Sequence, residues 1–375
     1  MRIGFDVRPF LKKETGVGVY FKHLLFHLAQ IDKSNEYFLF SSSFKDRFPV
    51  QKIPPFSKKH FRDLRLPVKV MNFFWHKLGW PPLEYFFKTD FDLTHSPTPL
   101  ILPTKGKKIV TVYDLFFMDF PRMTDKEARK DFVNKAEDAF LKADGIVAIS
   151  QFTKNQLIKK FSVEEKKVEV IYLGLNPEFK IDIPVEESEK IREKYSLPSS
   201  FILFVGAIEP RKNLLNLVDA VKIIHKKHKR VPLVVVGQKG QDYKNLERKV
   251  RQNELESWVQ IMGYLPDKDV RAFYRLASVF AFPSLCEGFG LPLLEAMASG
   301  VPVVASNYSA MPEIAQDAAL YFDPKDPYDI ADRIVQVMKD ENLYQKLKAR
   351  GKKRALDFDW RATAAHTLRF YESLF

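Results

Sequence analysis

Short runs of apolar residues alternate with longer amphipathic stretches along most of the chain. The short runs have the length and composition of buried strands, and the stretches between them carry apolar residues at helical spacing. In the N-terminal half this pattern predicts strands at 3–7, 37–41, 92–95, 109–112, 145–149 and 168–172, and helices at 19–29, at 125–142 and after Ser150. Strands that alternate with helices predict an α/β fold with parallel sheets.

The alternation resumes in the C-terminal half, after a charged segment that Pro184 and Pro198 bound. Strands are predicted from 201 onward and at 233–236, 259–262, 279–282 and 302–305. We therefore expect two domains, 1–175 and 199–359, joined by a linker at 176–198. A final helix at 360–375 is expected to pack back on the first domain.

The stretch 286–306, CEGFGLPLLEAMASGVPVVAS, joins a strand, a glycine-containing turn, a short helix and another strand. Pro292 suits the first turn of the helix, and Gly300 ends it. Gly288 and Gly290 let backbone amides approach a ligand at the positive end of that helix. This arrangement predicts an anion-binding site.

Two acidic residues, Glu287 and Glu295, stand on either side of this turn. A carboxylate beside a phosphate site is not expected to bind the phosphate itself. It can accept hydrogen bonds from hydroxyl groups, and sugar and ribose hydroxyls are the natural candidates.

The spacing E-x7-E within EGFGLPLLEAMASGVPVVAS resembles the signature of the retaining nucleotide-sugar glycosyltransferases of family 4, in a mannosyltransferase-like branch. The resemblance implies the GT-B fold, in which two Rossmann-like domains with parallel sheets face a central cleft. It implies that Glu295 holds the ribose hydroxyls and that Glu287 holds the sugar hydroxyls. The amides of Phe289, Gly290 and Leu291 would bind sugar and phosphate oxygens.

A second motif, Gly206 followed by Arg211-Lys212-Asn213, resembles the family's G-x-x-x-x-R-K-N. A guanidinium and an ammonium group can together neutralise a diphosphate. The resemblance further implies that the backbone of Gly263, Tyr264 and Leu265 lies near the nucleobase. It also implies that the G-x-G formed by Gly16 and Gly18 faces the donor, although a plain turn is the alternative interpretation of this short pattern.

Candidates for contacts with the acceptor are His95, Tyr113 and Asp114, which follow or end predicted strands of the first domain. In open α/β sheets, ligands sit beyond the carboxyl ends of strands. Many family members have histidine where this chain has Tyr113, and a tyrosine does not act as a base near neutral pH. For His95 the alternative is a structural histidine at the end of a strand.

Charge is unevenly distributed in this chain of 375 residues with a net charge of +13. Residues 45–88 contain ten Lys or Arg against three Asp or Glu, with many aromatic residues between them. Lysines mixed with aromatics favour an anionic membrane surface, and a solvated face over core aromatics is the alternative. A nucleic-acid partner is not expected, because no basic helix or reader motif is present.

The N-terminus enters a strand pattern directly and no 18-residue apolar run occurs, so we expect a cytoplasmic protein, at most peripheral on the membrane. The single cysteine, Cys286, excludes an internal disulfide. The string D-x-D occurs at 90–92, 267–269 and 357–359, but none follows a nucleotide-binding strand, and neither a metal nor a resident cofactor is expected.

We expect transfer of a hexose from a nucleoside diphosphate sugar to a hydroxyl of a saccharide or polyprenol-linked saccharide, in surface polysaccharide assembly. GDP-mannose is the favoured donor, with UDP-glucose and UDP-N-acetylglucosamine as alternatives. An inactive GT-B scaffold at the membrane is the alternative that is not an enzyme.

Overall fold

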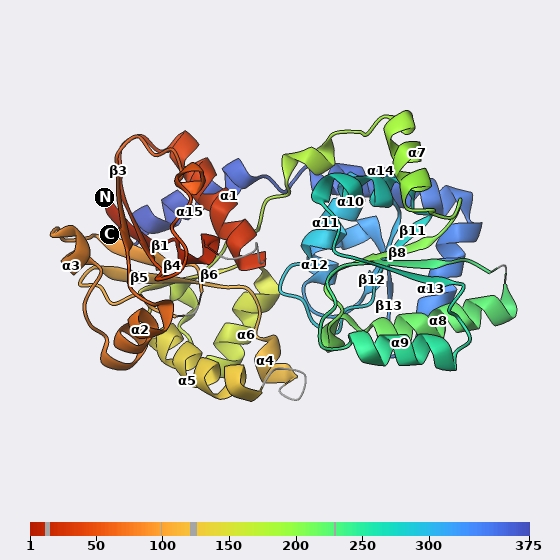
Figure 1. Ribbon diagram of the computed structural model, residues 1–375, viewed down its shortest axis with the longest axis horizontal. Helices are drawn as coiled ribbons and strands as arrows, with labels where there is room; N and C mark the ends of the chain where they lie inside the picture. Colours follow the sequence, from red (N-terminus) through yellow and green to blue (C-terminus); the bar gives the residue numbers. More distant parts are fainter. Residues whose placement is uncertain (12–15, 99, 121–125, 229) are drawn as a thin grey trace. The chain divides into compact units, whose positions relative to one another are not determined.

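The computed structural model describes residues 1–11, 16–98, 100–120, 126–228 and 230–375, and it divides into two compact units. Unit 1 comprises Met1–Gly174 together with Asp359–Phe375, and unit 2 comprises Leu175–Phe358. Each unit is built on one parallel sheet (Figure 1).

Unit 1 has a seven-stranded sheet in the order β3-β2-β1-β4-β5-β6-β7, and all its strand pairs are parallel. Apolar residues dominate the central strands, which are buried on both faces, as parallel sheets require. Their bounds are β1 Arg2–Asp6, β2 Glu36–Ser42, β3 Lys59–Leu64, β4 Leu93–Ser96, β5 Lys107–Val112, β6 Gly145–Ala148 and β7 Val168–Val170.

Helices cover both faces of this sheet. One face lies under α1 (Gly16–Ile31) and α15 (Trp360–Ser373), and the other under α2 (Val68–Phe73), α5 (Lys126–Lys142) and α6 (Gln151–Phe161) (Figure 1). Successive side chains of each strand point to opposite faces of the sheet, so the same strands supply the hydrophobic core on each face. The remaining helical segments of unit 1 are η1 Arg8–Phe10, η2 Val50–Lys52, η3 Phe74–Leu78, α3 Glu84–Phe87, α4 Phe116–Asp119 and η5 Glu165–Lys167.

The region 45–88, for which the apolar pattern predicts no strand or helix, contains a strand and helices. β3 pairs with β2 at the edge of the sheet, from Tyr37 opposite Lys59 to Ser42 opposite Leu64. Its sequence, KHFRDL, is mostly charged because an edge strand exposes its side chains, and the apolar signal of a strand is then weak. The prolines of this region lie at the boundaries of these elements, as Pro67 does at the start of α2, and so do not prevent them from forming.

The last helix, α15, is part of unit 1, where it lies against α1. Trp360 stacks on His23 with ring centroids 5.0 Å apart, and it closes over Gly174, where a Cβ would lie 2.4 Å from the Trp360 backbone nitrogen. Tyr371, fully buried, reaches the side chain of His95.

Unit 2 has a six-stranded sheet in the order β10-β9-β8-β11-β12-β13, which is a doubly wound Rossmann order. Figure 1 shows α8, α9 and α13 on one face and α7, α10, α11 and α14 on the other. The strands are β8 Ile202–Val205, β9 Leu233–Val236, β10 Val259–Gly263, β11 Val279–Phe282, β12 Val303–Ser306 and β13 Ala319–Phe322.

The helices of unit 2 fill the expected places between these strands. Their bounds are η6 Pro177–Lys180, α7 Val185–Lys194, η7 Pro210–Lys212, α8 Leu214–Lys227, α9 Tyr243–Gln252, α10 Asp267–Leu276, α11 Leu291–Ala298, α12 Met311–Ala315, η8 Gln316–Ala318, α13 Pro327–Lys339 and α14 Glu341–Ala355. The segment 176–198, expected to be a linker, is grouped with unit 2, where Lys194 and Tyr195 both donate hydrogen bonds to Asp269 of α10.

None of the helices within the described ranges is long and apolar enough to cross a membrane.

Candidate active site

The candidate site of unit 2 lies where the strand order reverses, between β8 and β11. At such a switch point, the loops after the two strands leave in opposite directions and open a space for a ligand. The loop after β8 carries Gly206, Arg211 and Lys212, and the loop after β11 carries Glu287 to Gly290. Two sequence motifs that lie about 75 residues apart are thereby brought together.

Glycines shape the carboxyl edge of the neighbouring strands. The Gly206 N–H donates to Val236 O at 2.8 Å, and the Gly237 N–H donates to Gly263 O at 2.8 Å. A Cβ on Gly237 would lie 1.9 Å from Gly206 O, so the loops after β8 and β9 approach more closely than any side chain permits. The φ of Gly237 is 153°, which L residues rarely adopt.

Arg211 and Lys212 are held by a single turn of 3-10 helix, η7, which ends at Asn213 in the left-handed conformation with φ 59°. The buried side-chain amide of Asn213 donates to Pro283 O at 3.0 Å and to Pro324 O at 2.7 Å. Asn213 therefore ties the loop after β8 to the loops after β11 and β13. In addition, the Leu285 N–H donates to Arg211 O at 2.8 Å.

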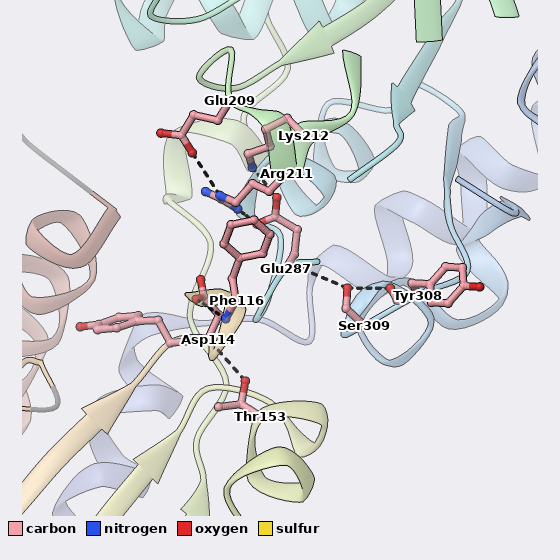
Figure 2. A network of polar contacts seen from close by, with 10 residues as sticks. Asp114, Phe116, Thr153, Glu209, Arg211, Lys212, Glu287, Tyr308 and Ser309 are labelled. Carbon is pink, nitrogen blue, oxygen red and sulfur yellow. Dashed lines mark hydrogen bonds and ion pairs between the residues drawn. The ribbon is translucent and has the colours of Figure 1, made fainter. Parts of the chain in front are cut away.

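The two cations converge on one carboxylate (Figure 2). Arg211 Nη1 lies 2.8 Å from Glu287 Oε2, and Lys212 Nζ lies 2.5 Å from Glu287 Oε1. Arg211 Nε also lies 3.1 Å from Glu209 Oε2. The family resemblance implies that Glu287 holds sugar hydroxyls, whereas in this structure both of its carboxylate oxygens accept hydrogen bonds from cations.

The ionisation of this cluster follows from its burial and its charges. Burial by itself disfavours the ionised carboxyl, but the charges of Arg211 and Lys212 outweigh it and lower the pKa of Glu287 to about 2. Burial lowers the pKa of Lys212, and the charge of Glu287 opposes that effect. Lys212 also lies over the Phe282 ring, 5.1 Å from its centroid. The cluster is a pair of cations anchored on an acid that stays ionised at neutral pH.

The N-terminal end of α11 borders the cluster in sequence. Gly290 precedes the helix with φ 94°, no side chain caps it, and a Cβ there would lie 2.9 Å from the Met311 methyl group. Phe289 packs its ring edge-to-face on Phe358 with centroids 5.7 Å apart. Gly288, Phe289 and Gly290 are buried and Leu291 is partly buried.

Glu295, in α11, is partly buried and accepts a hydrogen bond from the Tyr274 hydroxyl, 3.0 Å from Oε2. Burial raises the pKa of Glu295 to about 7; the bond from Tyr274 opposes this rise, and the charge of Asp267 adds to it. The carboxyl group can therefore change its ionisation near neutral pH.

The remaining residues predicted to contact the donor, Gly263, Tyr264 and Leu265, lie at the end of β10 and in the loop after it. Gly263 has φ 74° with open space where a Cβ would point. Tyr264 is exposed, whereas Leu265 is buried. Backbone atoms at Gly263 are thus unobstructed, and the side chain of Leu265 belongs to the core.

In unit 1, His95 has the structural role that sequence analysis gave as the alternative. Its ring is fully buried, Nδ1 lies 2.5 Å from the Tyr371 hydroxyl, and Nε2 lies 2.7 Å from Thr111 Oγ1. Burial lowers the pKa of His95 to about 3. With both nitrogens engaged and no surface open, this side chain has no means of contacting an acceptor.

Tyr113 and Asp114 follow β5, as expected. The Tyr113 ring meets Tyr20 edge-to-face at 5.4 Å, burial raises its pKa well above the ordinary value, and its carbonyl accepts from Thr153 Oγ1 at 3.2 Å. Asp114 Oδ1 accepts from the Phe116 N–H at 3.1 Å (Figure 2). The Tyr113 hydroxyl is buried and has no hydrogen-bond partner among the described residues.

Gly16 and Gly18 belong to the first turn of α1 rather than to a loop before it. Gly16 is exposed and Gly18 is buried. Residues 12–15 of the predicted turn lie outside the described residues, as does residue 125 of the predicted helix.

Four residues of this site were not singled out from the sequence. They are Glu209, Asn213, Tyr274 and Ser309. Ser309 Oγ accepts from the Glu287 N–H at 3.1 Å and donates to Tyr308 O at 2.7 Å, as Figure 2 shows. Asn213 had a signal, since it ends the R-K-N motif. Tyr274 and Ser309 belong to distant segments that only the fold brings to the acids.

No group of three or more His, Cys, Asp or Glu that could hold a metal ion occurs among the residues the structure describes. Of the D-x-D strings, the one at 267–269 begins α10, and its Asp269 is engaged by Lys194 and Tyr195.

Comparison with known proteins agrees with this geometry. The family model Glycosyltransferase Family 4 matches residues 15–179, and the model Glycosyl transferases group 1 matches residues 187–354. The chain is 29% identical to O-antigen chain mannosyltransferase B of Escherichia coli over 387 residues, covering 100% of both. It is 36% identical over 246 residues to the serotype-specific mannosyltransferase WbdA of Escherichia coli, covering 64% of this chain and 30% of that protein.

Among solved structures, Anabaena Alr3699/HepE in complex with UDP-glucose superimposes with a TM-score of 0.76 at 17% identity, covering 100% of both chains. At that identity the likeness establishes the fold, which is GT-B. The two family models lie side by side and together match nearly all of both units. The chain belongs to glycosyltransferase family 4 and is a hexosyltransferase similar to that family's mannosyltransferases.

Proposed function

We propose that this enzyme transfers mannose from GDP-mannose to a hydroxyl of a saccharide or lipid-linked saccharide, with retention of the anomeric configuration, during surface polysaccharide assembly. The observation that carries the proposal is the convergence of Arg211 and Lys212 on Glu287 at the switch point of unit 2, next in sequence to the uncapped α11. Cations held in this way are ready to receive a diphosphate without reorganising.

In the proposed reaction the bond between the sugar C1 and the diphosphate oxygen breaks, and its electron pair leaves with the nucleoside diphosphate. Arg211 and Lys212 stabilise that charge. The acceptor oxygen bonds to C1 from the same face, and its proton passes to the departing phosphate. Glu287 keeps Lys212 charged, and its carboxylate also orients the sugar hydroxyls of the donor. Glu295 holds the ribose hydroxyls. No side chain is assigned as a covalent nucleophile.

The choice of donor rests on similarity. O-antigen chain mannosyltransferase B and WbdA are both mannosyltransferases by name, and the first is covered over its whole length. UDP-glucose is the second candidate, because the structurally similar HepE was solved with it, and UDP-N-acetylglucosamine is the third. An inactive scaffold is disfavoured because the pair of cations and both acids are present.

The donor is tested by incubating the enzyme with GDP-mannose, UDP-glucose and UDP-N-acetylglucosamine and measuring nucleoside diphosphate release, with and without a chelator. We expect GDP-mannose to be used, activity to persist in chelator, and NMR of the product to show a retained configuration. Arg211→Ala and Lys212→Ala should each lower the rate tens to hundreds of fold, since a charged hydrogen bond contributes about 1.5–3 kcal/mol. Turnover of a UDP-sugar alone would replace the proposed donor, and failure with every donor and acceptor would favour the scaffold.

A further inference from the structure

A basic cavity of about 570 Å³ lies in unit 1, on the face of the sheet where Figure 1 draws α2 and α5. Its walls come from η3 and the turn after it, from the loop between β4 and β5, from the start of β5 and from the second half of α5. Lys108 is the second residue of β5 and the strand ends at Val112, so the cavity lies about 13 Å from the carboxyl end that Tyr113 follows.

Five lysines and one carboxylate line this cavity. The lysines are Lys77, Lys105, Lys108, Lys135 and Lys142, and the carboxylate is Asp138. Lys142 pairs with Asp138 at 2.7 Å, and Lys105 with the exposed Asp90 at 3.3 Å. The ammonium group of Lys108 has no ion pair with any carboxylate of the described residues. The cavity therefore carries a surplus of positive charge.

Large apolar side chains are exposed along residues 66–85, the segment from which Leu78 and its neighbours enter the cavity wall. Of the sixteen exposed large hydrophobic residues in the described ranges, six fall between 66 and 85: Leu66, Val70, Phe73, Leu78, Trp80 and Tyr85. Leu78 also lines the cavity and is 59% exposed, and Trp80, two residues further, is 56% exposed. The Trp80 and Tyr85 rings are 6.0 Å apart.

An aqueous anion would gain nothing from this apolar surround, and an apolar partner would gain nothing from five lysines. A phospholipid at a membrane surface satisfies both, because its phosphate carries negative charge and its acyl region begins a few ångströms deeper. Tryptophan and tyrosine favour that boundary. Aliphatic Leu66, Val70 and Leu78 distinguish the surface from a nucleic-acid site, which would offer aromatics for stacking.

We propose that unit 1 docks on anionic membranes through this surface, with a phospholipid headgroup in the lysine-lined cavity and Leu78 and Trp80 in the lipid interface. Docking would then be independent of the donor site in unit 2, so it can be measured whether or not the proposed transfer reaction is correct.

Vesicle flotation of the full chain tests this. We expect retention on vesicles of phosphatidylcholine mixed with phosphatidylglycerol, little retention on phosphatidylcholine alone, and release in about 1 M salt, where charges are screened beyond about 3 Å. Each lysine near an anionic surface strengthens binding roughly fivefold, so Lys77→Gln with Lys108→Gln should weaken retention roughly 25-fold. Lys346→Gln with Lys353→Gln, which removes two exposed lysines of α14 in unit 2, should change it little.

Insertion is read from tryptophan emission. Of the four tryptophans, Trp75 and Trp360 are buried and Trp258 is partly buried, whereas Trp80 is exposed. Anionic vesicles should shift the emission to the blue, and Trp80→Phe should abolish that shift while the protein stays bound. Circular dichroism melting confirms that each variant is folded.

Equal retention on neutral vesicles, unchanged retention of the Lys77/Lys108 variant, or an undiminished shift in Trp80→Phe would overturn the proposal. So would competition for the same lysines by single-stranded RNA at concentrations that displace the vesicles.

Discussion

Lys212 Nζ lies 2.5 Å from Glu287 Oε1, and the two side chains are only 7% and 9% exposed. Each charge of such a buried pair depends on the other, because removing one partner leaves the other charge uncompensated in a poorly solvated site. Arg211, on the second oxygen of Glu287, makes the acid the centre of a three-membered cluster. The ligand site and the stability of unit 2 therefore depend on the same atoms.

The first prediction concerns this cluster. Glu287→Leu should lower the free energy of unfolding by about 3–5 kcal/mol, because it leaves the buried Lys212 without its carboxylate, whereas Arg211 keeps Glu209. Lys212→Met should cost less, since Glu287 keeps Arg211. The double variant should recover part of the loss, which a double-mutant cycle from chemical denaturation would measure as coupling. Strict additivity of the two substitutions would show that the pair does not interact.

The same cluster predicts an effect of acid. The folded-state pKa of Glu287 is lowered to about 2, against an ordinary value of 4.5. Its contribution to stability is therefore complete above about pH 4.5 and is lost as the pH falls through 2. The difference in stability between wild type and Glu287→Leu should narrow over that range.

The second prediction concerns the pH dependence of donor binding through Glu295, whose pKa burial raises to about 7. The stability that the neutral carboxyl gives is present below pH 4.5 and is lost as the pH rises through 7. The ribose hydroxyls of the donor are expected to bind the ionised carboxylate of Glu295. The KM for donor should therefore fall as the pH rises through 7. Glu295→Gln should raise KM roughly tenfold and flatten its pH profile.

Tyr274→Phe is the control for that assignment. The hydrogen bond from Tyr274 opposes the rise in the pKa of Glu295, so its removal should move the break in the KM profile to higher pH. A profile that keeps its break in Glu295→Gln would assign the titration to another group.

The third prediction concerns Asn213, which donates to the carbonyls of Pro283 and Pro324. Asn213→Ala leaves Pro283 O without its donor, and a buried unsatisfied group costs about 1–3 kcal/mol. Pro324 O also accepts from the Asn216 amide at 2.9 Å, so it keeps a partner. Asn213→Gly loses the same bonds but tolerates φ 59°. Both variants should melt at lower temperature by calorimetry, Ala more than Gly. If Asn213→Ala melted at the same temperature as the wild type, the amide of Asn213 would not be what ties the loops together.

The fourth prediction contrasts two glycines at strand ends. Gly237→Ala should prevent unit 2 from folding, because the new Cβ would lie 1.9 Å from Gly206 O. Gly263→Ala meets only open space at φ 74°, so it should cost no more than about 2 kcal/mol of backbone strain. Soluble yield and melting temperature separate the two outcomes. Similar behaviour of both variants would contradict the close approach of the loops.

Local signals predicted most of the elements, because they act over a few residues. Ser150 caps α6 by accepting from the Thr153 N–H, as its position before an amphipathic stretch indicates. Pro292 lies in the first turn of α11, and Gly300 follows its end with φ 74°. The strand β3 was missed because its charged edge position removes the apolar pattern on which the prediction depends.

The structure brings together three charged residues that the motifs name, but their pairing was not predicted. The two motifs name Arg211, Lys212 and Glu287, yet nothing in their spacing says that the acid is the partner of both cations. His95 shows the same limit, since a histidine at a strand end has the same local sequence whether its ring meets a ligand or Tyr371.

The sequence by itself determined the alternation of strands and helices, the parallel sheets, the family and the charged residues of the candidate site. Those properties depend on side-chain periodicity and on short motifs, which are written in consecutive residues. Only the tertiary structure decided that Glu287 holds two cations, that Tyr274 supports Glu295, and that a lysine-lined cavity opens between η3 and α5. Each of these depends on strand order and helix packing, which bring residues tens of positions apart within a few ångströms.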